Sequence, residues 1–318
     1  MASTASKHDI RLPGGRTGTP LQIATANPKN PAEAIAKGTS LATFPLPGTL
    51  FVPDGDGPFP VVIVVPGSLG LAPSHLAKSE LLVEAGIAAC PIEPFLARSV
   101  TSTIANQTQY SFAASAWDVL VTAAALAERP EIDATRIGAQ GHSRGGSAVL
   151  TAAAVPFAAA HPAPKLRAVY AAYPWSGHQF ERPELGGTRV RAIIGDRDDW
   201  CSVQQVQAHV HAMTLAGGDA TLRIVDGAHH SFDRATPFEA LPDARVAPAA
   251  PTVYLADDGA MIHPVTNAAD PELVDRDLMV YAIKAGFGRE GAHIAGREDL
   301  APVFDEDMLA FWRSALEA

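Results

Sequence analysis

The chain has few cysteines, with only Cys90 and Cys201 among its 318 residues. Two cysteines cannot build the disulfide framework of small secreted domains, so we interpret both as buried apolar residues in a reducing compartment. No apolar run approaches the roughly 18 residues that a membrane-spanning helix needs, and residues 1–15 lack the apolar segment of a secretory signal. The sequence therefore predicts a cytoplasmic protein with no membrane partner.

Positive charge is also scarce. Lysine and arginine number 24 against 34 aspartates and glutamates, which gives a formal net charge of −10 without any basic cluster. Because nucleic-acid binding depends on clustered basic residues, we expect no nucleic-acid partner. Hydrophobic residues make up 47% of the chain and charged residues 18%, a balance that argues against disorder and for a sizeable core.

The middle of the chain alternates predicted strands and helices. This alternation runs from about residue 61 to 226 and is typical of an α/β fold with a doubly wound, mostly parallel sheet and helices on both faces. Residues 61–65 are all β-branched and apolar, so we expect a central strand buried on both sides. The other expected strands are 87–90, 136–140, 166–173, 190–194 and 221–225, and the expected helices are 75–85, 112–126, 147–155 and 203–213.

The regions outside this alternation are less regular. Residues 1–40 are rich in Pro, Gly, Ala and Thr, and we interpret them as an N-terminal arm on a single domain of residues 41–318. Residues 234–302 are expected to form an irregular decoration of that domain. The further expected elements are a hairpin of edge strands within 41–58, a small hairpin near 253–262, a helix beginning at Asp270 and a closing helix over 304–316.

One motif stands out within the alternation. Gly141-His142-Ser143-Arg144-Gly145 matches G-x-S-x-G and lies between a predicted strand and a predicted helix, the context of a nucleophile elbow. A serine at the tip of such a sharp turn needs neighbours without side chains, because the backbone doubles back on itself. The following helix N-terminus offers free N–H groups to a developing oxyanion. The motif predicts that Ser143 is a nucleophile.

A serine nucleophile needs a base, and the base needs an acid that orients it. An acidic loop, Gly195-Asp196-Arg197-Asp198-Asp199, directly follows one predicted strand, and a loop containing His229 and His230 follows the last predicted strand. Both loops leave carboxyl ends of strands, where sites lie in open α/β sheets. The order serine, acid, histidine predicts a triad, while spacing leaves three aspartates available as its acid.

Together, the elbow with Gly146, the Gly-x-x-Asp pattern at 195–198 and the sequence Gly-Ala-His-His-Ser-Phe at 227–232 resemble the dienelactone hydrolase family of α/β-hydrolases. The resemblance covers about residues 45–235 and the final helix. It implies that Ser143 is the nucleophile, Asp198 the acid and His230 the base. It also implies an oxyanion hole formed by the backbone N–H groups of Ser68 and Arg144.

This chain departs from the family pattern at two positions. Members that open dienelactone use a cysteine nucleophile, where this chain has Ser143, and carry a glutamate in the oxyanion loop, where it has Gly67. We therefore do not expect dienelactone to be the substrate. We expect a serine esterase of the wider family that forms an acyl-enzyme, needs no cofactor and acts on a small-molecule ester. The same triad could cut an amide, lactone or peptide, or the fold could serve ligand binding alone. Homo-oligomer formation is left open.

Several side chains lie on or beside loops at the carboxyl edge of the predicted sheet, where pockets form. Arg98 could bind a substrate carboxylate or form a structural ion pair, and the aromatic residues could line an apolar pocket or belong to the core. The pocket candidates are Phe95, Arg98, Trp175, Trp200 and Phe232.

Other residues are given structural interpretations. His209 and His211 have H-x-H spacing, but they fall on a predicted helix where residues two apart diverge, so we predict no metal. His229 is interpreted as structural because consecutive residues point apart. The Arg144 side chain is expected to be solvated or salt-bridged, and Cys201 is not expected to act as a second nucleophile.

Overall fold

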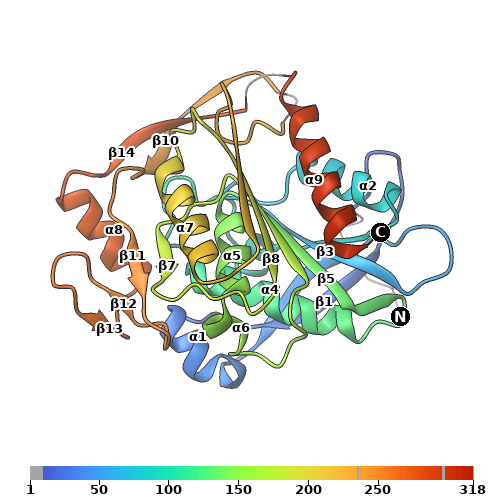
Figure 1. Ribbon diagram of the computed structural model, residues 1–318, viewed down its shortest axis with the longest axis horizontal. Helices are drawn as coiled ribbons and strands as arrows, with labels where there is room; N and C mark the ends of the chain where they lie inside the picture. The colour runs from blue at the N-terminus through green and yellow to red at the C-terminus, as the bar shows by residue number, and fades with distance from the viewer. Residues whose placement is uncertain (1–9, 235, 296–297, 318) are drawn as a thin grey trace, which may run out of the picture.

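The computed structural model describes residues 10–234, 236–295 and 298–317 (Figure 1). Its centre is a six-stranded sheet in which every neighbouring pair is parallel. The predicted doubly wound α/β sheet is thus confirmed, and residues 61–65 are fully buried within it. In spatial order the strands are β4 (Ala88–Pro91), β3 (Phe59–Val65), β5 (Ile132–His142), β6 (Ala168–Ala172), β8 (Arg189–Gly195) and β9 (Ala220–Val225).

Helices cover both faces of this sheet. α4 (Phe112–Ala127) and α5 (Arg144–Ala153) pack against each other and against β3 and β5. On the opposite face, α2 (Pro73–Glu84) and α9 (Ala301–Leu316) lie side by side (Figure 1). α7 (Val203–Leu215) packs on the last two strands. Of the two short helices, α3 (Pro94–Ala97) follows β4 and α6 (Val155–Ala158) packs against α5. Among the described residues, every helix is too short or too polar to cross a bilayer.

Residues 19–50 contain two strands and two short helical segments. β1 (Thr19–Thr25) pairs antiparallel with β2 (Phe44–Leu50), and α1 (Pro31–Lys37) and the 3₁₀ helix η1 (Gly38–Ser40) connect them. The hairpin expected within residues 41–58 is therefore wrong, because the partner of β2 comes from residues 19–25. The two prolines of β2, Pro45 and Pro47, fit an edge strand that uses few of its own N–H groups.

The chain between β9 and α9 contains one helix and supplies all but one strand of two small sheets. β10 (Glu239–Val246) pairs with β14 (Arg289–Ile294), while β7 (His178–Phe180), β11 (Val253–Leu255), β12 (Met261–Ile262) and β13 (Ala269–Asp270) form the other sheet. The small hairpin expected near residues 253–262 is present as β11 and β12. The helix expected from Asp270 is α8 (Asp275–Lys284); it begins later because Asp270 belongs to β13, where its carboxylate accepts the Glu272 N–H. We call residues 239–294 the cap.

Two contacts fasten the cap to the rest of the chain near the N-terminus of α8. The Asn30 side-chain amide donates to the carbonyl oxygens of Pro271 and Leu273, each at 2.7 Å. The Asp275 carboxylate accepts the N–H of Phe112, the first residue of α4, at 2.8 Å. These contacts set where α8 lies relative to the carboxyl edge of the central sheet.

Candidate active site

Ser143 occupies a strained turn between β5 and α5. Its φ of 55° and ψ of −114° lie in a region that non-glycine residues rarely adopt, and such strain typically marks functional positions. The flanking glycines are sterically required: a Cβ on Gly141 would lie 1.9 Å from the Gly145 carbonyl oxygen, and one on Gly145 would lie 2.3 Å from that of Val65. The Ser143 N–H donates to the Ala172 carbonyl at 2.9 Å, which fixes the turn to β6.

The structure brings Ser143, His230 and Asp198 into one hydrogen-bonded line. His230 Nε2 lies 2.9 Å from Ser143 Oγ, and His230 Nδ1 lies 2.7 Å from Asp198 Oδ2. Because an ionised carboxylate only accepts, Nδ1 carries the imidazole proton and Nε2 has a free lone pair facing the hydroxyl. This is the tautomer in which the imidazole can accept a proton from Ser143.

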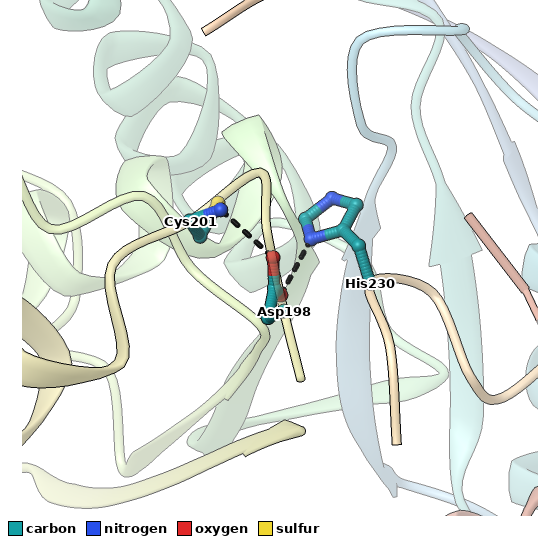
Figure 2. Close-up of side chains that lie close together, drawn as sticks. All are labelled: Asp198, Cys201 and His230. Carbon is teal, nitrogen blue, oxygen red and sulfur yellow. Dashed lines mark hydrogen bonds and ion pairs between the residues drawn. The ribbon is translucent and has the colours of Figure 1, made fainter. Parts of the chain in front are cut away.

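Asp198 is itself held in place. Its second oxygen, Oδ1, accepts the backbone N–H groups of Trp200 at 2.9 Å and Cys201 at 2.8 Å, as Figure 2 shows for Cys201. The side chains of Asp198 and His230 are 0% and 3% exposed, so neither hydrogen bond competes with bulk water. Trp200 also stacks on the His230 ring, with centroids 5.2 Å apart.

The two neighbouring aspartates have other partners. Asp196 accepts the Gly227 N–H at 2.7 Å and thereby joins the acid loop to the histidine loop. Asp199 accepts the N–H of His293 at 3.0 Å and lies 2.7 Å from its Nδ1, so it ties the acid loop to β14 of the cap. Ser202, and not Asp199, caps α7, because the Ser202 side chain accepts the Gln205 N–H.

Asp198, Cys201 and His230 are also the residues that come nearest to a metal-ligand set within the described part of the chain. Hydrogen bonding accounts for their proximity, since both carboxylate oxygens of Asp198 already accept N–H groups. Burial, together with the Asp198 charge, raises the pKa of the Cys201 thiol well above its usual value. A protonated thiol is a poor ligand and a poor nucleophile.

Ser68 and Arg144 stand where an oxyanion hole would form. Arg144 is the first residue of α5, a position whose N–H has no acceptor within its own helix. Ser68 follows β3, and its hydroxyl pairs with the Gln107 side chain at 3.0 Å. The loop approaches the elbow closely, because a Cβ on Gly67 would lie 3.1 Å from the His142 carbonyl oxygen and 3.2 Å from Ser143 Cβ. A side chain at this position, which is glutamate in dienelactone-opening relatives, would therefore crowd the elbow.

The Arg144 side chain is buried, contrary to the expectation of a solvated or salt-bridged arginine. Its guanidinium lies over the rings of Tyr110 and Phe112, 4.2 and 4.1 Å from their centroids. It also donates to the carbonyl oxygens of Gln107 at 2.8 Å and Tyr110 at 2.7 Å. Carbonyl dipoles and aromatic faces thus balance the buried charge, and the arginine holds the loop before α4 against the elbow.

A cavity of about 900 Å³ opens at Ser143. The catalytic edge contributes Ser68, Arg144, Trp175 and Trp200 to its walls, and the cap closes the other side. Phe112 and Trp175 stack at 4.4 Å, and His178 packs against both. Burial lowers the pKa of His178, which favours its neutral form. Cap residues that line the cavity include Val246, Val253, Asp275, Leu278 and Met279.

Three of the five pocket candidates lie elsewhere. Arg98 forms a buried bidentate ion pair with Asp118, at 2.8 and 3.0 Å, which satisfies its charge and leaves none for a substrate carboxylate. Phe95 packs against Tyr110 in a small satellite core, and Phe232 is fully buried in the main core. Trp175 and Trp200 do line the cavity.

The other histidines considered in the sequence, His209, His211 and His229, do not come together at one site. His209 is buried near Ser176, and His211 is exposed on α7, so the two diverge as the helical spacing predicts. His229 packs against Phe238 and points away from Ser143. The cap residues that line the cavity were not predicted from the sequence. Short strands without a clear periodicity do not indicate against which part of the chain they pack.

A parallel α/β sheet with a strained serine elbow, a histidine and an acid on successive strand-end loops, and an oxyanion loop after β3 defines the α/β-hydrolase fold. The dienelactone hydrolase family model matches residues 46–250, more than half of the chain. The chain therefore belongs to the dienelactone hydrolase family and is an enzyme of the hydrolase class.

Several solved structures are similar to the chain, while no curated protein sequence matches it. A putative dienelactone hydrolase from Klebsiella pneumoniae is 20% identical with a TM-score of 0.48, covering 68% of this chain and 89% of that one. Esterase 2 from Thermogutta terrifontis, phosphorylated by paraoxon, is 16% identical with a TM-score of 0.48 and coverages of 59% and 80%. A dienelactone hydrolase-like promiscuous phosphotriesterase from metagenomic libraries is 17% identical with a TM-score of 0.47 and coverages of 68% and 84%.

Proposed function

We propose that this hydrolase cleaves carboxylic esters through an acyl-enzyme intermediate, with Ser143 as nucleophile, His230 as base and Asp198 as the orienting acid. The observation that carries the proposal is the line from Ser143 Oγ to His230 Nε2 at 2.9 Å and from His230 Nδ1 to Asp198 at 2.7 Å. A chain that only bound ligands would have no use for a serine aimed at the free lone pair of an oriented imidazole.

The reaction has two acyl-transfer steps. Ser143 Oγ attacks the ester carbonyl carbon while His230 Nε2 takes the hydroxyl proton, and the N–H groups of Arg144 and Ser68 stabilise the oxyanion. His230 then gives this proton to the leaving alcohol, which leaves an ester between Ser143 and the acyl group. In the second step His230 deprotonates a water molecule that attacks this ester and releases the acid.

The cavity favours a substrate with a bulky apolar group. At about 900 Å³ it is at the upper end of the range for small-molecule sites, and apolar side chains dominate its walls. Phe112, Trp175 and Leu278 offer faces without charge to an acyl or alcohol group. Each methylene buried there adds about 0.8 kcal/mol, or roughly fourfold in kcat/KM, until the cavity is filled.

A panel of p-nitrophenyl esters of increasing acyl length tests the proposal. Wild-type kcat/KM should rise from acetate to medium-length chains, and Ser143→Ala should lower kcat by about 10⁵- to 10⁶-fold. Ser147→Ala is the matched control, since Ser147 lies one turn further along α5 and donates to the Trp175 carbonyl. Retention of a tenth of the wild-type kcat by Ser143→Ala would exclude the mechanism. The same kcat/KM measurements on amides and lactones show whether the enzyme prefers either of these substrate classes to esters.

A further inference from the structure

A continuous chain of buried hydrogen bonds runs behind the elbow, from helix α9 to the loop that carries His230. Its distances are 2.8 Å from Trp312 Nε1 to Gln140 Oε1, 3.1 Å from Gln140 Nε2 to His142 Nε2, 2.8 Å from His142 Nδ1 to Tyr173 Oη and 2.7 Å from Tyr173 Oη to Asp233 Oδ1. Each of the five residues is 2% exposed or less. Nothing in the reaction as described uses this chain.

The donor and acceptor groups of the five side chains fix the direction of each of these four hydrogen bonds. The Trp312 indole can only donate, so Gln140 must present its carbonyl oxygen to it and its amide N–H₂ to His142. His142 Nε2 is therefore the acceptor and Nδ1 carries the proton, which it donates to the Tyr173 oxygen. The Tyr173 hydroxyl proton is then free to bond the Asp233 carboxylate. All four bonds donate in one direction, toward Asp233.

This direction is kept at working pH because the histidine in the chain stays neutral. Burial, with smaller effects from Lys78 and Arg234, lowers the pKa of His142 to about 3. Burial and the neighbouring Asp233 charge raise the pKa of Tyr173 well above its usual value. Neither group changes its protonation between pH 5 and 9, so the chain acts as a fixed brace.

The brace joins the two segments that must meet for catalysis. His142 is the last residue of β5 and directly precedes Ser143. Asp233 lies three residues after His230, on the loop that follows β9. Tyr173 bonds both, and its ring packs against the His230 ring at 4.8 Å. Tyr173 also has a φ of 36°, an unfavourable backbone conformation for a tyrosine that its surroundings must enforce.

We propose that Tyr173 is a positioning residue that, through its hydroxyl, holds the Ser143 elbow and the His230 loop at reacting distance. The inference rests on the proposed function, since it assigns a role in the proton transfer from Ser143 to His230. Tyr173→Phe keeps the ring against His230 but has no atom to accept the His142 proton or to bond Asp233. A small displacement of nucleophile and base lowers the rate of proton transfer without changing the substrate cavity.

A matched control lies three residues before Tyr173, on strand β6. Tyr170 is also buried, and its hydroxyl donates to a carboxylate, Asp307 of α9, at 3.1 Å, away from Ser143. Tyr173→Phe should lower kcat by about 10- to 100-fold with little change in KM, and should lower the rate constant for fluorophosphonate labelling in parallel. Tyr170→Phe should lower the melting temperature to a similar extent while kcat and the labelling rate constant stay near the wild-type values.

Two results would overturn the inference. One is a Tyr173→Phe kcat within twofold of the wild type; the other is an equal kcat loss in both phenylalanine variants, which would indicate a general stability effect. If Tyr173→Phe does not fold, the variants His142→Asn and His142→Leu test the inference. The asparagine amide replaces the Nδ1–H donor to Tyr173 and should keep most of the activity, whereas leucine has no donor and should lose it. Equal hydrolysis by wild type and Ser143→Ala would instead refute the proposed function, and this inference with it.

Discussion

Replacing Asp198 by asparagine should inactivate the enzyme while preserving its shape, and the structure gives the reason. Asp198 Oδ1 accepts two backbone N–H groups, from Trp200 and Cys201. In Asp198→Asn the amide oxygen must stay at this position, because an amide –NH₂ cannot accept a hydrogen bond. The –NH₂ then points at His230 Nδ1 and donates to it. The imidazole proton is forced onto Nε2, where it faces Ser143 Oγ and prevents proton acceptance.

The magnitude follows from the loss of the reactive tautomer. The same tautomer error lowers kcat by about 10⁴ in a serine protease, which corresponds to about 5.5 kcal/mol of transition-state stabilisation. Asp196→Asn is the matched control, since an asparagine oxygen can still accept the Gly227 N–H, and it should cost less than about tenfold. Asp199→Asn keeps an oxygen that can accept the His293 N–H but loses the carboxylate contact with the His293 ring, so it should lower the melting temperature with a kcat loss of less than about tenfold.

The assay is steady-state hydrolysis of one p-nitrophenyl ester by the three variants, with a thermal melt of each to show that it is folded. A folded Asp198→Asn enzyme with more than a tenth of the wild-type kcat would refute the tautomer argument. An inactive Asp196→Asn beside an active Asp198→Asn would move the acid to residue 196.

Three further predictions follow from the site and its surroundings. Hydrolysis should slow in acid, because a protonated His230 cannot accept the hydroxyl proton, and a rate that does not fall with pH while the protein stays folded would exclude this base. Stability should also fall in acid: burial lowers the pKa of His142 to about 3 and of His209 to about 4, so the unfolded chain binds more protons below pH 6.5. Each of these two buried histidines should lower the free energy of unfolding by about 2 kcal/mol at pH 5. In urea melts at several pH values, His209→Gln should therefore weaken the pH dependence of the unfolding free energy, whereas the control His211→Gln should not. Trp175→Ala should raise KM for long acyl chains more than for acetate; an equal change for both would place the acyl group elsewhere.

The central sheet and the elbow could be predicted from the sequence because their signals are local. A run of β-branched residues at 61–65 needs burial on both faces. The glycines around Ser143 are required because an added Cβ would lie as close as 1.9 Å to a backbone oxygen. The loops with Asp198 and His230 follow strands whose carboxyl ends necessarily meet at one edge. The distances between the three side chains come from the structure, and their catalytic roles stay a prediction.

The parts that were missed depend on contacts between distant segments. The edge strand β2 pairs with residues 19–25 and not with its chain neighbour. The cap, which begins at residue 239, folds back over the cavity that opens at Ser143. Arg98 has the loop position of a pocket residue, yet its partner Asp118 lies on the buried face of α4. Periodicity shows which face of a helix is buried, but it does not show which distant side chain forms an ion pair with a charged residue on that face.

Intact-mass analysis after treatment with a fluorophosphonate tests the central claim, that Ser143 is a base-activated nucleophile, most directly. Wild-type protein should gain the mass of a single adduct, and peptide mapping should place it on Ser143. Cys201→Ala should label as the wild type does, because the Cys201 thiol is buried and its pKa is raised well above the usual value. Ser143→Ala should gain no mass. An unlabelled wild-type protein, or an adduct that persists in Ser143→Ala, would contradict the account.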